Sequence, residues 1–145
     1  TSGVDMVRKT LAEAQATYLF ESVQVRPGHP ALAARLADGR IVLGLPGNPL
    51  AAYTALYSYL PPLLAGMRGL PLPTLDTAEI AQDIPALTAS SQQRLIPALV
   101  RECRAHPLPR RASYMLSGLS KATHLLVADA SGHTAGDRVP LLPVF

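Results

Sequence analysis

The chain has 145 residues, of which 48% are apolar, 5% are aromatic and 16% are charged. This composition is typical of a folded protein with one domain or two small ones, and it excludes an intrinsically disordered chain. The net charge of +3 gives only weak support for a polyanionic partner. Charges, prolines or glycines interrupt every apolar run, so we expect no membrane span, no signal peptide at the N-terminus and a cytoplasmic protein.

The first seventy residues combine helical and strand patterns. Apolar residues three and four positions apart predict an amphipathic helix from residue 5 to about 16. Alternating residues rich in Phe and Val predict a strand over 18–25, and two prolines around a glycine predict a loop at 26–30. Because an Asp-Gly pair favours a tight hairpin, two antiparallel strands are expected on either side of it, at 31–36 and 40–45.

A proline-rich stretch separates a helical segment from a series of short strands. Helical composition continues from Pro49 to about Gly69, and the pair Pro61-Pro62 is expected to kink or break that helix. Residues 71–76 resemble a semi-rigid linker. Short strands are then predicted at 78–84, 94–101, 125–127 and 138–144. We therefore expect an α/β unit at 1–70 and a β-rich domain at 77–145.

The segment GLPGNP, residues 44–49, carries the strongest local signal for a binding site. Its glycines suit a sharp turn or a close approach, Asn48 is a plausible helix N-cap, and Pro49 suits the first helical position. The N-terminus of a helix directs amide groups and partial positive charge at whatever lies beyond it, and an oxyanion fits that place. The alternative is an ordinary strand-to-helix connection with good capping residues.

Two other segments bear on the same site. The intervening hairpin is expected to bring Arg26 and His29 of the sequence RPGHP beside the GLPGNP turn, where Arg26 offers a planar pair of donors and His29 a charge only when protonated. Asp5 begins the first predicted helix, where it either favours the helix dipole or holds Mg²⁺ beside a phosphate. The single Cys103 is expected to be a small apolar filler.

A basic group offers a different interpretation of the chain. Arg101, Arg104, Arg110 and Arg111 are close in sequence and suit a nucleic-acid backbone, but few aromatic residues accompany them. We therefore expect neither a nucleic acid nor a membrane as a partner.

Taken together, five segments resemble the C-terminal part of the molybdopterin molybdotransferases, the family that inserts molybdenum during cofactor biosynthesis and includes the E domain of gephyrin. They are SGVDMVRKTL, RPGHP, LGLPGNP, ASYMLSGLSKATHLLV and GDRV, and they cover nearly the whole chain in order. The resemblance implies that 1–70 is the C-terminal half of an α/β molybdopterin-binding domain and that 77–145 is a β-barrel domain. It also implies a homodimer and a missing N-terminal region, without which this piece is expected to be inactive.

By this resemblance the chain is a transferase that inserts molybdate into adenylylated molybdopterin, with Mg²⁺ present and AMP released. Asp5 would be the catalytic and metal-binding carboxylate. The residues that would bind substrate and molybdate are Arg26, His29, Pro46, Gly47, Asn48 and Pro49. Two departures from the family pattern, His29 in place of Lys and Ala51 in place of Ser, leave open an alternative: a non-catalytic binding or interaction module derived from this family.

Overall fold

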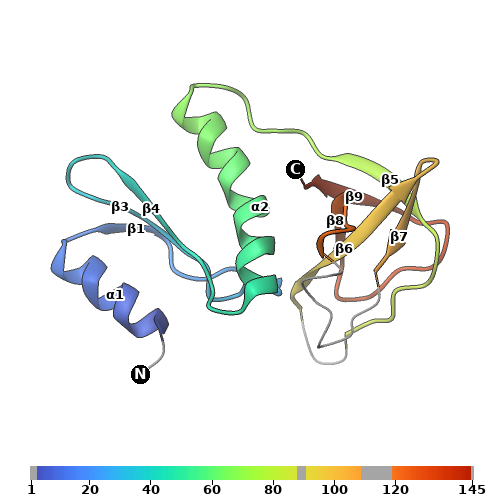
Figure 1. Cartoon of the computed structure of the whole chain (residues 1–145), viewed down its shortest axis with the longest axis horizontal. Helices are drawn as coiled ribbons and strands as arrows, with labels where there is room; N and C mark the ends of the chain where they lie inside the picture. Colours follow the sequence, from blue (N-terminus) through green and yellow to red (C-terminus); the bar gives the residue numbers. More distant parts are fainter. Residues whose placement is uncertain (1–2, 88–90, 109–118, 145) are drawn as a thin grey trace.

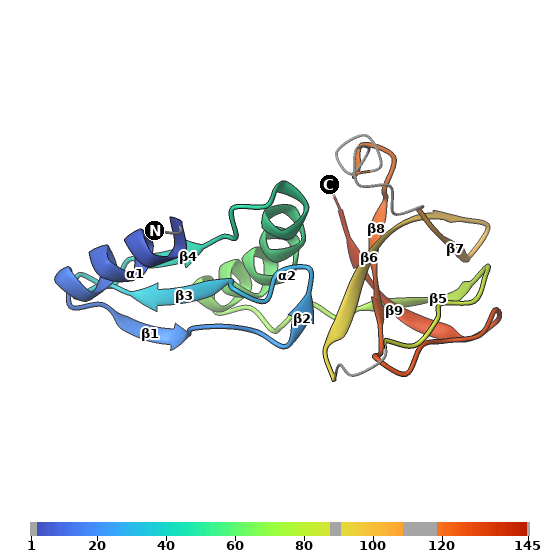
Figure 2. The same ribbon diagram turned by 90° about the horizontal axis from the view of Figure 1, so that it is seen from below.

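The computed structural model describes residues 3–87, 91–108 and 119–144, with the backbone alone for residues 3–5. A small antiparallel sheet with helix α1 lies at one end, a closed barrel lies at the other, and helix α2 lies between them (Figure 1, Figure 2). The elements are α1 (Gly3–Glu13), β1 (Thr17–Phe20), β2 (Val25–Arg26), β3 (Leu32–Arg35), β4 (Ile41–Gly44), α2 (Pro49–Met67), β5 (Asp76–Ile80), β6 (Gln93–Arg101), β7 (Arg104–Pro107), β8 (His124–Ala128) and β9 (Arg138–Pro143).

The predicted hairpin is confirmed: β3 and β4 pair antiparallel around the Asp-Gly turn, and β1 pairs antiparallel with β3. Helix α1 covers one face of this sheet, where Leu11 packs against Leu32 and Ala34. All three strands are antiparallel, so the described residues do not show the sheet of an α/β domain. The expected division into domains at 71–76 stays a prediction.

The sequence predicts a kink or a break at Pro61 and Pro62; helix α2 runs through both prolines, so a break is wrong, and the kink stays a prediction. Each proline removes one backbone hydrogen bond. The helix continues because its sides pack on other elements. Tyr59 contacts Phe20 of β1 at a ring centroid distance of 5.3 Å, and the prolines line a cavity of about 280 Å³ with the linker and β9. No helix in the described part of the chain is long and apolar enough to cross a membrane.

The five strands β6, β7, β5, β9 and β8 form a closed barrel, because β8 pairs with both β9 and β6. Its interior is filled largely by small and branched residues: Ala78, Ile80, Ile84, Ile96, Ala98, Ala105, Leu126, Ala128, Val139 and Leu141. A small barrel needs such residues, since its interior holds only one layer of side chains from each strand. Strand β7 and the short β2 are additions to the strands predicted from sequence.

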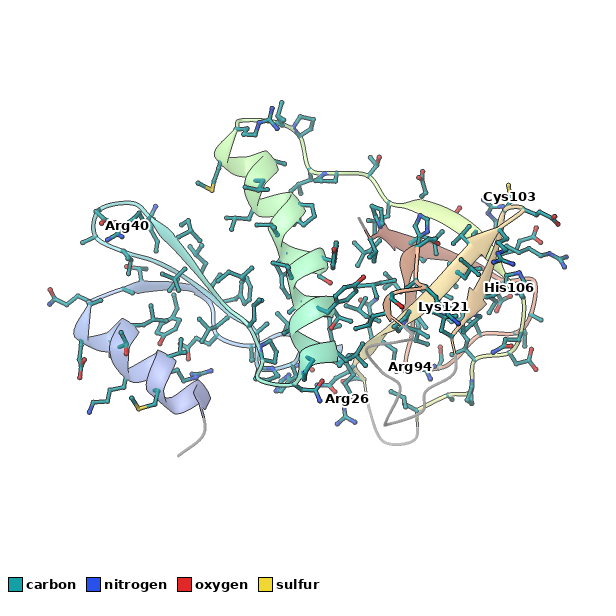
Figure 3. The ribbon with its side chains drawn as sticks, viewed as in Figure 1. Arg26, Arg40, Arg94, Cys103, His106 and Lys121 are labelled. Atoms are coloured by element: carbon teal, nitrogen blue, oxygen red, sulfur yellow. The ribbon has the colours of Figure 1, made fainter. Side chains whose placement is uncertain are left out.

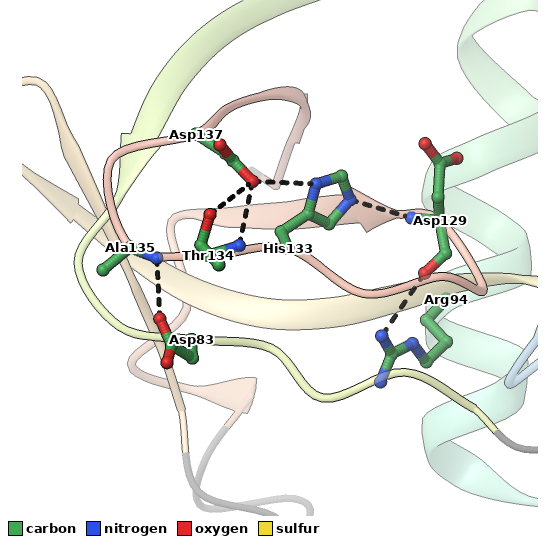
Figure 4. A network of polar contacts seen from close by, with 7 residues as sticks. All are labelled: Asp83, Arg94, Asp129, His133, Thr134, Ala135 and Asp137. Carbon is green, nitrogen blue, oxygen red and sulfur yellow. Dashed lines mark hydrogen bonds and ion pairs between the residues drawn. The ribbon is translucent and has the colours of Figure 1, made fainter.

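The loop between β8 and β9 is tied to the segment after β5 by a polar network (Figure 4). His133 accepts a hydrogen bond from the Asp129 N–H at its Nε2, at 3.0 Å, and Asp83 accepts one from the Ala135 N–H at 2.8 Å. Gly132 permits the close packing, since a Cβ there would lie 2.5 Å from the Ile84 carbonyl oxygen. The network explains these polar residues as parts of the barrel's structure.

Candidate anion site at the start of helix α2

The GLPGNP turn forms the helix start that its sequence predicts. Asn48 has extended backbone angles, and its side chain accepts a hydrogen bond from the Ala51 N–H at 3.1 Å. The Asn48 carbonyl accepts the first helical bond, from the Ala52 N–H, at 2.8 Å. Pro49 follows at the first helical position, where its missing N–H costs no bond. Asn48 and Pro49 therefore have a structural role first, which is to start helix α2.

The same cap limits how many amides remain for a ligand. Pro49 has no N–H, and the Ala51 N–H is already bound by Asn48. Within the described residues, the amides of Gly47, Asn48 and Leu50 have no protein acceptor. These amides lie in an exposed turn. An anion bound here would be held by this small set of backbone donors together with side chains from elsewhere.

The two glycines of the turn serve different purposes. A Cβ at Gly44 would lie 2.7 Å from two carbon atoms of Leu32, so Gly44 is required by packing. A Cβ at Gly47 would meet nothing within 4 Å, and Gly47 is exposed. The fold thus does not require glycine at position 47, and the space beside its backbone is open. Pro46, by contrast, is buried, two residues after the end of β4.

The RPGHP loop lies against the first turns of α2, as the sequence predicts. The hydroxyl of Thr54, which is fully buried, donates hydrogen bonds to the Pro27 carbonyl at 3.0 Å and to the Ala51 carbonyl at 3.1 Å. Gly28 has a φ of +126°, a conformation that only glycine adopts readily, and it packs beside Thr54. Thr54 therefore joins the loop to the helix start.

Arg26 lies between the N-terminal end of α2 and the barrel (Figure 3). It belongs to β2, which pairs in parallel with the start of β6. Its Nε donates a hydrogen bond to Gln92 Oε1, and in the described part of the chain its Nη1 and Nη2 have no protein acceptor. The side chain is exposed. Two parallel N–H groups are thus available to an oxyanion.

His29 is held by its own loop. Its Nδ1 lies 2.6 Å from the Val23 carbonyl oxygen, and because a carbonyl only accepts, Nδ1 carries the proton. In the neutral ring the exposed Nε2 is then an acceptor, which disfavours an anion. Only a protonated ring would offer an anion a second N–H donor, at Nε2.

Asp5 lies in the first turn of α1, and its side chain is outside the described part of the structure. Among the described residues, no hydrogen bond or ion pair joins that turn to the RPGHP loop or to α2. Those residues also contain no group of three or more His, Cys, Asp or Glu side chains able to hold a metal ion. The described side chains therefore do not form a magnesium site, and we assign no step to the metal.

Cys103 and two arginines of the basic group, Arg101 and Arg104, lie on the side of the barrel away from helix α2 (Figure 3). Arg101 and Arg104 are exposed around the tight turn between β6 and β7, whereas Arg110 and Arg111 lie outside the described residues. Cys103 is exposed at the tip of this turn with a φ of +62°, so the expected role as an apolar filler is wrong. The hairpin tip is too short to bury a side chain.

The sequence matches no protein-family model and no curated protein. The structure is similar to two molybdopterin biosynthesis MoeA proteins from Pyrococcus horikoshii, with TM-scores of 0.77 and 0.69 and sequence identities of 17% and 18%. It is also similar to a molybdenum cofactor biosynthesis protein from Pyrococcus furiosus, with a TM-score of 0.69 and 20% identity.

Each of these similarities covers 97% of this chain, and the chain spans 35%, 39% and 54% of the three solved chains. At such low identity the likeness shows a shared fold. The strand pairing itself confirms the small barrel predicted for the C-terminal part of the chain. Thr54 and Gln92 contact the RPGHP loop, but no sequence motif marks either residue.

Proposed function

We propose that this chain acts in molybdenum cofactor biosynthesis, as part of an enzyme that inserts molybdate into adenylylated molybdopterin and releases AMP. The observation that carries the proposal is the bond from Thr54 to the Pro27 carbonyl, because it places the arginine loop beside the helix start. The sequence resemblance and the fold of the three solved proteins support the same pathway. A homodimer and Mg²⁺ held largely by substrate phosphates and water belong to this proposal.

In this proposal the residues act by positioning and by electrostatic stabilisation. The end of the Arg26 guanidinium would bind two oxygens of molybdate or phosphate, and the amides of Gly47, Asn48 and Leu50 would bind further oxygens. The partial positive charge at the start of α2 favours the same ligand. Asp5 is proposed, from the resemblance alone, as the carboxylate beside the metal and the phosphates.

Molybdate binding tests the site directly. Isothermal titration of the full chain with sodium molybdate is compared for the wild type, Arg26→Gln and Arg40→Gln. Arg40 is a matched control, since it is an exposed arginine paired with Asp38 at the distant hairpin. Loss of a charged, two-pronged contact is expected to weaken binding by roughly tenfold to a hundredfold in Arg26→Gln only. Equal effects of the two substitutions, or no binding to the wild type, would overturn the proposal.

The non-catalytic alternative is favoured by two observations. Ala51 is buried where the family carries a hydroxyl, and His29 is turned to a carbonyl of its own loop. Incubation with adenylylated molybdopterin, molybdate and Mg²⁺, carried out on the chain joined to the N-terminal region that the resemblance implies, separates the alternatives by AMP release. Binding without AMP release in the wild type, combined with release in the double variant His29→Lys and Ala51→Ser, would identify a binding module that has lost its activity.

A further inference from the structure

Gln92 connects the barrel to the candidate anion site. It immediately precedes β6, and its Oε1 accepts the hydrogen bond from Arg26 Nε. The backbone around it is fixed as well, since β2 pairs with β6 and the Gln93 N–H donates to the Gln24 carbonyl at 3.1 Å. The arginine and the barrel are therefore joined by main chain and by side chain.

The contacts of Gln92 determine how its amide is oriented. Gln92 Nε2 lies 3.3 Å from His29 Nδ1, but that nitrogen donates to Val23 at the shorter distance of 2.6 Å, so it does not accept from Gln92. The reversed amide would place Nε2 against Arg26 Nε, one donor facing another. The oxygen of Gln92 therefore faces Arg26.

This contact selects which edge of the guanidinium is presented to a ligand. A guanidinium can bind an oxyanion through Nε and one Nη, or through Nη1 and Nη2. Because Gln92 engages Nε, only the Nη1–Nη2 edge of Arg26 remains. A long arginine side chain also loses considerable rotamer freedom when it binds, and an arginine already held in place loses less.

We propose that Gln92 is a positioning residue, through which the barrel sets the orientation of Arg26 for an oxyanion at the start of α2. The nature of the ligand rests on the proposed function, but the contact between Gln92 and Arg26 does not. The barrel thereby contributes to a site whose other residues all come from the first part of the chain.

The matched variants are Gln92→Met and Gln93→Met. Methionine keeps the length of the side chain and removes the amide oxygen. Gln93 is the adjacent glutamine, but its amide faces Asp129, at 3.4 Å, on the barrel loop. Nuclear magnetic resonance of the full chain measures solvent exchange of the Arg26 Nε–H. We expect exchange to become about tenfold faster in Gln92→Met and to stay unchanged in Gln93→Met.

Molybdate titration of the same proteins supplies the second measurement. Gln92→Met is expected to weaken binding about fivefold, as for the loss of one preordered side chain, and to have no effect in an Arg26→Gln background. Unchanged Nε–H exchange in Gln92→Met would overturn the inference whatever molybdate does. An equal loss of affinity with and without Arg26 would also overturn it. If the wild type binds no molybdate while its Nε–H is protected by Gln92, the proposed function fails and the positioning contact stands.

Discussion

Replacing Thr54 by valine tests the contact that joins the RPGHP loop to helix α2. Valine has the shape of threonine and a similar helix propensity, so the substitution removes the hydroxyl and little else. The bond to the Pro27 carbonyl contributes about 1 kcal/mol, and the partly buried carbonyl left behind adds to the loss, for a total of about 1.5 kcal/mol. With an unfolding entropy of roughly 2.1 cal/mol/K per residue, this corresponds to about 5 °C in Tm for the 145 residues.

Urea denaturation followed by circular dichroism measures the free energy of unfolding, and molybdate titration measures the effect on the site. Thr54→Ser keeps the hydroxyl and loses only a methyl group, so it is expected to bind molybdate like the wild type. Ser58→Ala is the control within the same helix, because the Ser58 hydroxyl donates only to the Thr54 carbonyl. The reasoning fails if Thr54→Val is as stable as the wild type, or if Thr54→Ser and Thr54→Val lose the same affinity.

Three further predictions concern single features of the fold. Gly44→Ala is expected to lower the free energy of unfolding by about 1 to 3 kcal/mol, because its Cβ would clash with a buried leucine of β3. Gly47→Ala should leave the free energy of unfolding unchanged and weaken molybdate binding. Equal stability of the two variants would contradict this prediction. Glu102 and Cys103 both have positive φ values, 49° and 62°, so the pair Glu102→Asn and Cys103→Gly should raise the free energy of unfolding by about 1 kcal/mol in urea titrations. Burial raises the pKa of Tyr59 above its ordinary value of 10.0, so the folded state favours the neutral phenol. The contribution of Tyr59 to the free energy of unfolding should therefore be full below pH 10 and should fall as the pH rises through the folded pKa. The free energy of unfolding of Tyr59→Phe should fall less steeply over that pH range. Identical slopes for the variant and the wild type would count against this role of Tyr59.

Local signals in the sequence predicted the elements that depend on local chemistry. The Asp-Gly hairpin, the Asn48 cap and the start of α2 all follow from residues within a few positions of one another. Strand β7 escaped prediction because its turn contains Glu102 and Cys103, which adopt positive φ without the usual glycine or asparagine. The proline pair was misjudged because the packing of α2 between two layers outweighs the loss of two backbone bonds.

The candidate site was predictable only in part, because some of its contacts join residues that are far apart in the sequence. The sequence predicts Arg26 beside the helix start because a hairpin returns the chain, and in the structure Thr54 of α2 bonds the carbonyl of Pro27, the residue after Arg26. The partner of Arg26 is Gln92, sixty-six residues away, and no spacing rule connects the two. Likewise, the tautomer of His29 depends on a carbonyl of its own loop, which a sequence motif does not reveal.

The cap of α2 explains why the GLPGNP turn needs help from the rest of the fold. Asn48 satisfies one of the amides that a helix start would offer to an anion, and Pro49 removes another. What remains is a small set of donors in an exposed turn, where solvent weakens each contact. In the proposed site the strong, charged contact would come from Arg26, whose neighbour Pro27 is bonded by Thr54 on the helix side and whose Nε is bonded by Gln92 on the barrel side. If the proposed site is correct, grafting the GLPGNP turn onto another strand and helix is therefore expected to transfer the helix start but not oxyanion binding, which molybdate titration of the grafted protein would measure.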